Sequence, residues 1–224
     1  IRKVSSKIAK EASFEVFEFD TIYRDITNFV TRDVSAFYLD FTKDILYIEK
    51  KDELSRRAIQ TVLYDVTHHL LRLLTPFIPH TTHEAYLHLP FHKEENVYLE
   101  NMPEYLDLGH EEILTKYEAF MDVRDNVLKA LEEARNNKVI GKSFNALLVL
   151  YPENEVAELL ASIPNLQQIF IVSQLEIKEG VGEFKFQNLS IDVLAAVGET
   201  CDRCWQVVPD TKEGLCPRCE TVLK

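Results

Sequence analysis

The residues of this chain best suited to chemistry are its four cysteines, all of which lie within the last 24 of its 224 residues. They form two C-x-x-C pairs, Cys201-Asp-Arg-Cys204 and Cys216-Pro-Arg-Cys219, which eleven residues separate. Each pair makes a tight turn that points two sulfurs at one ion, and the loop brings the second turn over the first. The spacing therefore predicts that Cys201, Cys204, Cys216 and Cys219 bind one zinc ion.

A four-thiolate shell leaves no coordination position open for water or substrate, so the predicted zinc site is structural rather than catalytic. A ribbon of about 24 residues buries too little apolar surface to fold alone, and the metal must supply much of its stability. An all-sulfur ligand set in so compact a ribbon favours zinc over iron. Disulfides are the less favoured alternative, because cysteines confined to paired turns are typical of a reducing compartment, which indicates the cytoplasm.

Two arginines and the single tryptophan accompany the cysteines. Arg203 and Arg218 lie inside the two C-x-x-C turns, and Trp205 directly follows the first turn. An exposed tryptophan between basic side chains is suited to stacking on an unpaired RNA base. Trp205 could equally close the small core of the ribbon, and the sequence does not decide between these roles.

No other motif in the sequence supports a reaction centre. Gly141-Lys142-Ser143 resembles the end of a phosphate-binding loop, but Asn136 stands where that loop needs a glycine. A helix precedes it, where the loop needs a strand. Lys142 could still contact a phosphate, or it could satisfy carbonyls at the end of that helix.

The histidines complete no metal-binding pattern either, and we expect them at the surface or the edge of the core. They include His68-His69 and His80-Thr-Thr-His83-Glu84. The chain also contains no glycine-rich dinucleotide fingerprint and no nucleophile elbow. The sequence therefore indicates a binding and structural unit rather than a self-contained catalyst.

The net charge of −12 argues against broad, sequence-independent binding to a phosphate backbone. Residues 108–146 hold six basic and seven acidic residues, and residues 201–224 hold four of each, so these near-neutral regions best suit a local nucleic-acid surface. No apolar run approaches the roughly 18 residues of a membrane span, and the polar N-terminus shows no signal peptide. Because an initiator methionine is lacking, we expect a piece of a longer protein.

The spacing of apolar residues predicts helices over the first 137 residues and a small α+β module after Gly141. The predicted helices are an amphipathic stretch at Ile1–Ala12, a long helix capped by Asp20-Thr21 and reaching Phe41, a helix capped by Ser55 and ended by Pro76 and Pro79, a short helix at Thr81–Leu89 and a long helix at His110–Asn137. In the module we expect a helix at Asn154–Ala161 and strands at Asn145–Tyr151, Gln168–Leu175, Phe184–Phe186 and Leu189–Ala196. Ahead of the long helix at His110–Asn137, we expect Val97–Leu99 to be extended.

These elements predict a mainly α fold in four parts. An antiparallel helix bundle occupies residues 1–107, and a long connecting helix and turn occupy residues 108–143. A small α+β module follows at residues 144–198, and a four-cysteine zinc ribbon at residues 199–224.

Several motifs resemble, in the same order, those of bacterial isoleucyl-tRNA synthetases. Val34-Ser-Ala-Phe-Tyr-Leu-Asp-Phe-Thr-Lys-Asp-Ile-Leu-Tyr47 is similar to their N-F-Y-L-D-x-x-K-D-x-x-Y helix, and Arg56–Tyr64 to the next helix. Leu74-Thr-Pro-Phe-Ile-Pro-His-Thr-Thr-His-Glu84 resembles the L-x-P element of class I anticodon-binding bundles. Arg124–Arg135 with Val139–Ser143 resembles the helix and turn that follow, and the cysteine tail resembles the C-terminal zinc finger of the family. The resemblance is weakest over residues 91–109 and 151–196.

The resemblance implies the C-terminal region of an ATP-dependent isoleucine–tRNA ligase, with a bundle and ribbon that bind the anticodon arm of tRNA(Ile). The catalytic signatures H-I-G-H and K-M-S-K-S and the editing domain of the family are absent. ATP and Mg²⁺ would therefore bind only in the missing catalytic domain, and this chain alone would be inactive. The residues expected to contact tRNA are Trp205, Arg203 and Arg218 in the ribbon, with Lys142, Arg124 and Arg135 as weaker candidates.

We also expect a cytoplasmic monomer. Two alternatives to the synthetase interpretation are an unrelated zinc-ribbon module that binds nucleic acid and a protein-interaction adaptor whose acidic bundle binds a basic partner.

Overall fold

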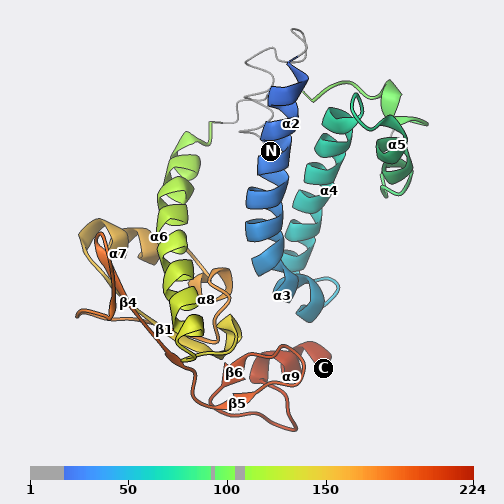
Figure 1. The fold of residues 1–224 in the computed structure, drawn as a ribbon. Coiled ribbons are helices and arrows are strands. Elements are labelled where there is room, and N and C mark those ends of the chain that lie inside the picture. Colours follow the sequence, from blue (N-terminus) through green and yellow to red (C-terminus); the bar gives the residue numbers. More distant parts are fainter. Residues whose placement is uncertain (1–17, 92–93, 104–108) are drawn as a thin grey trace. The chain divides into compact units, whose positions relative to one another are not determined.

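The computed structural model describes residues 18–91, 94–103 and 109–224, and the chain divides into two compact units. The first unit consists of Ile1–Leu46 and Lys51–Leu108, and the second of Tyr47–Lys50 and Gly109–Lys224. The described elements of the first unit are helices, whereas the second unit also contains a small sheet and a four-cysteine ribbon (Figure 1). The predicted fold class is confirmed. The helix predicted at Ile1–Ala12 lies outside the described residues.

One long helical segment begins the described part of the chain. It consists of α2 (Phe19–Asn28), the wider-wound π-helical η1 (Phe29–Leu39) and α3 (Asp40–Ile48), with helical backbone angles at both junctions. The predicted long helix is thus confirmed, and it extends beyond Phe41. The predicted cap at Asp20-Thr21 is wrong, because the helix begins at Phe19 and the side chain before it makes no capping hydrogen bond.

The next helix, α4 (Leu54–Leu74), lies beside α2 (Figure 1). Leu73, which belongs to the predicted apolar face of this helix, packs against Ile22 and Ile26 of α2. The predicted cap at Ser55 is wrong by two residues, because Glu53 holds the N-cap position.

α4 ends at Leu74, before Pro76 and Pro79, as predicted. The short helix α5 (Pro79–Leu87) begins two residues before the predicted Thr81 and ends two residues before the predicted Leu89. Pro79 fits its first turn, because a proline there loses no hydrogen bond and its fixed φ suits the helix. Leu71 of α4, Tyr86 of α5 and Val97 then bury one another's side chains.

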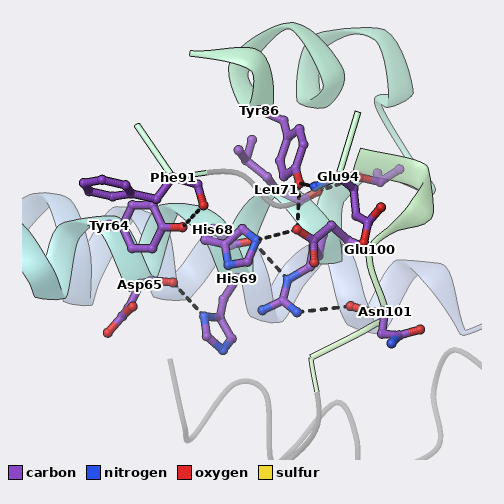
Figure 2. A network of polar contacts seen from close by, with 12 residues as sticks. Tyr64, Asp65, His68, His69, Leu71, Tyr86, Phe91, Glu94, Glu100 and Asn101 are labelled. Atoms are coloured by element: carbon purple, nitrogen blue, oxygen red, sulfur yellow. Dashed lines mark hydrogen bonds and ion pairs between the residues drawn. The ribbon is translucent and has the colours of Figure 1, made fainter. Parts of the chain in front are cut away.

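A network of polar contacts fastens the segment after α5 to α4 and α5 (Figure 2). The Glu100 carboxylate accepts a 2.6 Å hydrogen bond from the Tyr86 hydroxyl and lies 3.2 Å from Nε2 of His68. Arg72 donates to the carbonyl of Asn101 at 3.1 Å. His68 thus lies at the edge of the core and pairs with a carboxylate.

The same segment contains η2 (Val97–Leu99), a single 3₁₀ turn in place of the predicted extended stretch. The side chain of Asn96 accepts a hydrogen bond from the backbone N–H of Tyr98 at 3.0 Å and so caps this turn. A local side-chain bond of this kind competes with extended backbone.

The second unit contains a helix of 26 residues, α6 (Glu111–Asn136), which packs against a four-stranded sheet (Figure 1). The strand order is β2-β1-β4-β3, where β1 and β2 are parallel and the other pairs antiparallel. The bounds are Ala146–Pro152 for β1, Gln174–Ile177 for β2, Phe184–Phe186 for β3 and Leu189–Ala195 for β4. The 3₁₀ turn η3 (Ser143–Asn145) joins α6 to β1.

Between β1 and β2 the chain forms α7 (Asn154–Ala161), as predicted, and then the one-turn helix α8 (Leu166–Ile169). The strand predicted at Gln168–Leu175 is therefore wrong over residues 168–173, because β2 begins only at Gln174. A short apolar run does not distinguish a strand from a buried turn. Here a compact turn places the side chains of Ile169, Phe170 and Val172 in the core. Phe170 stacks on Phe120 of α6 with ring centroids 5.8 Å apart.

The ribbon follows β4 and contains the hairpin β5 (Glu199–Thr200) and β6 (Val207–Val208) and the helix α9 (Pro217–Leu223). The division of the second unit into a connecting helix, a module and a ribbon stays a prediction. Among the described residues, no helix is long and apolar enough to cross a membrane.

Candidate metal centre and nucleic-acid interface

Each cysteine pair lies in a turn that backbone hydrogen bonds fix. Cys201 directly follows β5, and its carbonyl accepts a 2.9 Å hydrogen bond from the N–H of Trp205, which closes the first turn. The second turn starts α9, where Cys216 is the N-cap residue and Pro217 occupies the first helical position. The side chain of Cys216 accepts from the N–H of Cys219, so this sulfur replaces the oxygen of an ordinary cap.

These turns bring all four sulfurs together. The Sγ atoms of Cys201, Cys204, Cys216 and Cys219 lie within 4.8 Å of one another, and each cysteine is buried. Sγ of Cys204 and Sγ of Cys216 are 3.7 Å apart. Four sulfurs at about 2.3 Å from a tetrahedral zinc ion are about 3.8 Å from each other. The cluster could therefore hold a metal ion, and its donor set fits the predicted one.

The backbone around the cluster stabilises negative charge on sulfur. Burial raises the pKa of Cys201, but hydrogen bonds from the backbone N–H groups of Cys204, Cys216 and Arg203 outweigh it and lower this pKa from 9.0 to about 6. Burial raises the pKa of Cys204 and of Cys219. A cation at the centre would offset that cost of burying thiolates, because metal binding and thiol deprotonation are coupled.

The small core of the ribbon does not include the tryptophan. Ile48 is buried together with the four cysteines, and Val208 and Leu215 pack against them. Trp205 is 66% exposed and has a φ of 63°, in the left-handed region that a bulky residue rarely adopts. Of the two roles left open for this ring, the structure excludes closure of the core.

Both arginines of the C-x-x-C turns bind the segment Tyr47–Lys50 of the same unit. Arg203 donates to the carbonyl of Ile48 at 2.8 Å, and its guanidinium opposes the rise that burial causes in the pKa of Cys219. Nε of Arg218 donates to the Glu49 carboxylate at 2.8 Å, and its Nη2 lies 2.6 Å from the same oxygen. These contacts make the arginines part of the ribbon's packing.

The three basic candidates in and after α6 differ in exposure. Arg124 is buried, at 4% exposed. Arg135 pairs with Glu132 of the same helix and lies 3.3 Å from the hydroxyl of Ser143. Lys142 is exposed, and its backbone N–H donates to the side chain of Asn145.

Two contacts of the ribbon were not predicted from the sequence. Ile48 joins the cysteine cluster, although it is more than 150 residues away along the chain. Ser173, at the entrance to β2, accepts a 2.7 Å hydrogen bond from the backbone N–H of Val207 in β6. No local pattern marks either residue, since its partner becomes known only from the fold.

Comparison with known proteins agrees with the resemblance in the motifs. Residues 3–150 match the family described as anticodon-binding domain of tRNA ligase. The chain is also 48% identical, over 236 aligned positions, to the isoleucine–tRNA ligases of Bacillus mycoides strain KBAB4 and of Bacillus cereus strains AH187 and AH820.

These alignments cover 99% of this chain but 26% of each relative, so the chain spans about a quarter of the length of the curated relatives it matches. The predicted resemblance to isoleucyl-tRNA synthetases is confirmed. Since the family match extends over well more than half of the sequence, the chain belongs to the family of anticodon-binding domains of tRNA ligases.

Proposed function

We propose that this chain recognises the anticodon arm of tRNA(Ile) as part of an isoleucine–tRNA ligase. The family match and the names of the relatives support this function. In such a protein, the chain would contribute binding energy and discrimination, while activation of isoleucine with ATP and Mg²⁺ would belong to parts of the protein outside this sequence. Phosphate contacts position a protein on RNA, and contacts to unstacked bases read its sequence.

We propose further that the cysteine cluster holds one zinc ion. Zinc accepts four thiolates in a closed tetrahedral shell, and the buried sulfurs have the proximity that this shell requires. When bound, the ion would cross-link the hairpin of β5 and β6 to α9. Backbone N–H groups would orient the sulfurs, and the positive charge of Arg203, outside the metal shell, would stabilise the Cys219 thiolate.

The single observation that carries the RNA-binding proposal is the conformation of Trp205. A large ring at 66% exposure gains little from burial, and a non-glycine residue in the left-handed region costs about 1–3 kcal/mol. The backbone of Trp205 closes the first cysteine turn, but glycine would adopt its φ without strain, and the exposed ring adds nothing to the ribbon core. A tryptophan at this position is explained if its ring stacks on an unpaired anticodon base, a contact worth about 1–3 kcal/mol per base.

The remaining candidates take different roles in this proposal. Lys142 is exposed and free to approach a phosphate, with Arg135 beside it at the end of α6. Arg203 and Arg218 act mainly by holding the ribbon, through Ile48 and Glu49. Arg124 has almost no exposed surface to offer a phosphate, so the proposal does not use it.

A tRNA ligand and thiolate metal ligands both suit the reducing cytoplasm, which we propose as the working compartment. A monomeric state stays a prediction.

The test is the affinity of the chain for an RNA hairpin with the anticodon-arm sequence of tRNA(Ile). Trp205→Ala should weaken binding by about 5- to 150-fold, the loss of one stacked base. Trp205→Phe is the matched control, because it keeps an aromatic face, and it should retain most of the affinity. Equal affinity of the original chain and the alanine variant would contradict the role of Trp205.

The hairpin also separates this function from its alternatives. A hairpin with another tRNA's anticodon should bind more weakly than the isoleucine hairpin. Equal binding of unrelated hairpins would instead indicate a general nucleic-acid module, and no binding at all would indicate a protein-interaction adaptor.

A further inference from the structure

One buried hydroxyl connects three parts of the second unit. Ser173 is 4% exposed, and its Oγ accepts a 2.7 Å hydrogen bond from the backbone N–H of Val207, in β6 of the ribbon. The same hydroxyl donates to the carbonyl of Phe144, in the turn between α6 and β1. The backbone carbonyl of Ser173 accepts a 2.6 Å hydrogen bond from the side-chain amide of Gln167. Both the donor and an acceptor site of this hydroxyl are thus in use.

The two hydrogen-bond partners of the Ser173 hydroxyl lie close in sequence to residues proposed to contact RNA. Val207 lies two residues after Trp205, and Phe144 lies two residues after Lys142. The stacking candidate and the phosphate candidate are therefore each within two residues of a backbone group that binds the same serine. The Val207 N–H is buried with this bond, and a buried donor without a partner is costly.

The next residue fastens the connection between the sheet and the ribbon. The side-chain amide of Gln174 donates to the carbonyl of Val197 at 2.8 Å and accepts from its N–H at 3.3 Å. It therefore pairs with the backbone of Val197 in the way that a neighbouring strand would. Gly198 follows with a φ of 136°, where a Cβ atom would lie 2.0 Å from the carbonyl oxygen of Val208. The connection is held on both sides rather than left as a flexible linker.

Ser173 and Gln174 are in turn held by the sheet. Gln174 begins β2 and is paired with Leu147 of β1, and β1 is paired along its length with β4. Most of the apolar side chains of β1 and β4 are buried in the core, so the sheet fixes the backbone position of Gln174 and of Ser173 before it. The sheet thus provides a rigid support for the ribbon.

Charge indicates what this support is for. Residues 147–200 carry two basic and eight acidic residues, whereas the turn region before them and the ribbon after them are close to neutral. A module so acidic is a poor surface for a phosphate backbone. Its contribution to RNA binding is then mechanical, through the geometry of the two regions that it joins.

We propose that Ser173 and Gln174 are positioning residues, which lock the cysteine ribbon onto the sheet so that Trp205 and the turn carrying Lys142 meet RNA in a fixed arrangement. The proposal rests on the function proposed above for Trp205. Its structural part, the locked orientation, can be measured without RNA.

The first measurement is the orientation of the ribbon in the zinc-loaded chain, from residual dipolar couplings of backbone amides, with hydrogen exchange of the Val207 amide. In Ser173→Ala, we expect exchange at Val207 to be at least about tenfold faster, as loss of a buried hydrogen bond implies, and the ribbon couplings to be averaged relative to those of the sheet. Ser190→Ala is the matched control. Its hydroxyl also accepts a backbone N–H, from Gly182 at 2.9 Å, but it does not touch the ribbon.

The second measurement is a double-mutant cycle for the anticodon-arm hairpin. Ser173→Ala alone should weaken binding by about fivefold or more, and the zinc content should stay at one per chain. On a logarithmic scale, Trp205→Ala should then cost less than half as much in the Ser173→Ala background as in the original chain. Gln174→Ala, which removes partly exposed bonds and leaves the core intact, should reproduce the effect in the same direction.

The outcomes separate this inference from the proposed function. Unchanged couplings and unchanged Val207 exchange in both variants would overturn the locked orientation, whatever the RNA does. Additive effects of Ser173→Ala and Trp205→Ala would overturn the positioning role. If the original chain fails to bind the hairpin while the couplings change as expected, the proposed function fails and the mechanical role of the two residues remains.

Discussion

At the scale of single residues, Trp205 combines a strained backbone with an exposed ring, so its proposed role in binding can be tested apart from its effect on folding. Glycine adopts a φ of 63° without steric cost, whereas tryptophan does not. The ring is also absent from the ribbon core formed with Ile48, Val208 and Leu215. Binding and stability should therefore respond in opposite directions to the same substitution.

We predict that Trp205→Gly makes the metal-loaded ribbon more stable by about 1 kcal/mol, because the strain is relieved. The same variant should bind the anticodon-arm hairpin about 5- to 150-fold more weakly, because the stacking face is lost. The measurements are the thermal unfolding of the ribbon and the hairpin affinity.

Trp205→Ala is the control for this prediction, since alanine removes the ring but keeps the strained φ. It should lose affinity without the gain in stability. A glycine variant that is less stable than the original chain would show that the ring supports the ribbon, in contradiction to its exposure.

The sequence predicts some of the site residues and not others, for identifiable reasons. The cysteine cluster follows from two turns of fixed geometry, so spacing alone is sufficient to find it. The exposure of Trp205 depends on which side chains fill the ribbon core, and one of these, Ile48, comes from a distant helix. The partner of Arg218, Glu49, is 169 residues away, so the sequence suggests a free arginine where the structure has an ion pair.

At the scale of elements, periodic segments are predicted best. The predicted helix at His110–Asn137 and α6 agree to within one residue at each end, and the predicted β3 and α7 have the observed bounds. The errors lie where tertiary contacts override a short pattern. Val97–Leu99 forms a turn because Asn96 caps it, and the run before β2 folds into α8 because three of its apolar side chains reach the core from a turn.

The network around Glu100 gives a prediction about acid stability. The Tyr86 hydroxyl, and to a lesser extent His68, hold the pKa of Glu100 below its ordinary value of 4.5. A carboxyl whose pKa is lowered by folding stabilises the fold fully above its unfolded pKa, and that contribution is lost as the pH falls through the folded pKa. Removing the Tyr86 bond should therefore matter most at neutral pH.

We predict that Tyr86→Phe lowers the free energy of unfolding of the first unit by about 1–3 kcal/mol at neutral pH, and by less as the pH falls through the folded pKa of Glu100. Urea unfolding followed by circular dichroism measures the cost at each pH. Tyr64→Phe is the matched control, because that hydroxyl donates to the carbonyl of Phe91 at 3.0 Å, a neutral acceptor. The cost of Tyr64→Phe should not change with pH, and a Tyr86→Phe cost that does not decrease as the pH is lowered would contradict the account.

The ribbon gives a second prediction at this scale. Cys216→Ser should reduce the zinc content from about one per chain to near zero and unfold residues 199–224, because it removes one metal ligand while the serine oxygen can still cap α9. The far-ultraviolet helical signal should remain largely intact, since α2, α4 and α5 have cores of their own.

A chelator added to the original chain should produce the same partial loss of structure. Collapse of the whole helical signal in Cys216→Ser would show that the ribbon and the helices share one cooperative core. A folded ribbon without metal would refute the structural role of zinc.

At the scale of the whole molecule, the order of the parts could be read from the sequence, and their assembly could not. A helical first unit, a sheet and a cysteine ribbon were all predicted in sequence order. The sequence did not indicate that Tyr47–Lys50 group with the second unit, or that one serine joins the ribbon, the sheet and the turn after α6. Such contacts link residues far apart along the chain, and no periodic pattern encodes them.

Charge at this scale points to local rather than general RNA binding. The chain carries a net charge of −12, so attraction to a phosphate backbone does not hold RNA over its whole surface. In the proposed function, binding would therefore depend on the near-neutral regions and on a base contact, and we expect it to be specific for one arm of the tRNA.

Footprinting of this chain on full-length tRNA(Ile) therefore tests the central claim most directly. We predict protection confined to the anticodon arm, weakened by Trp205→Ala and absent from a tRNA with an unrelated anticodon. Protection spread along the tRNA, or equal protection of unrelated tRNAs, would contradict recognition of the anticodon arm by this chain.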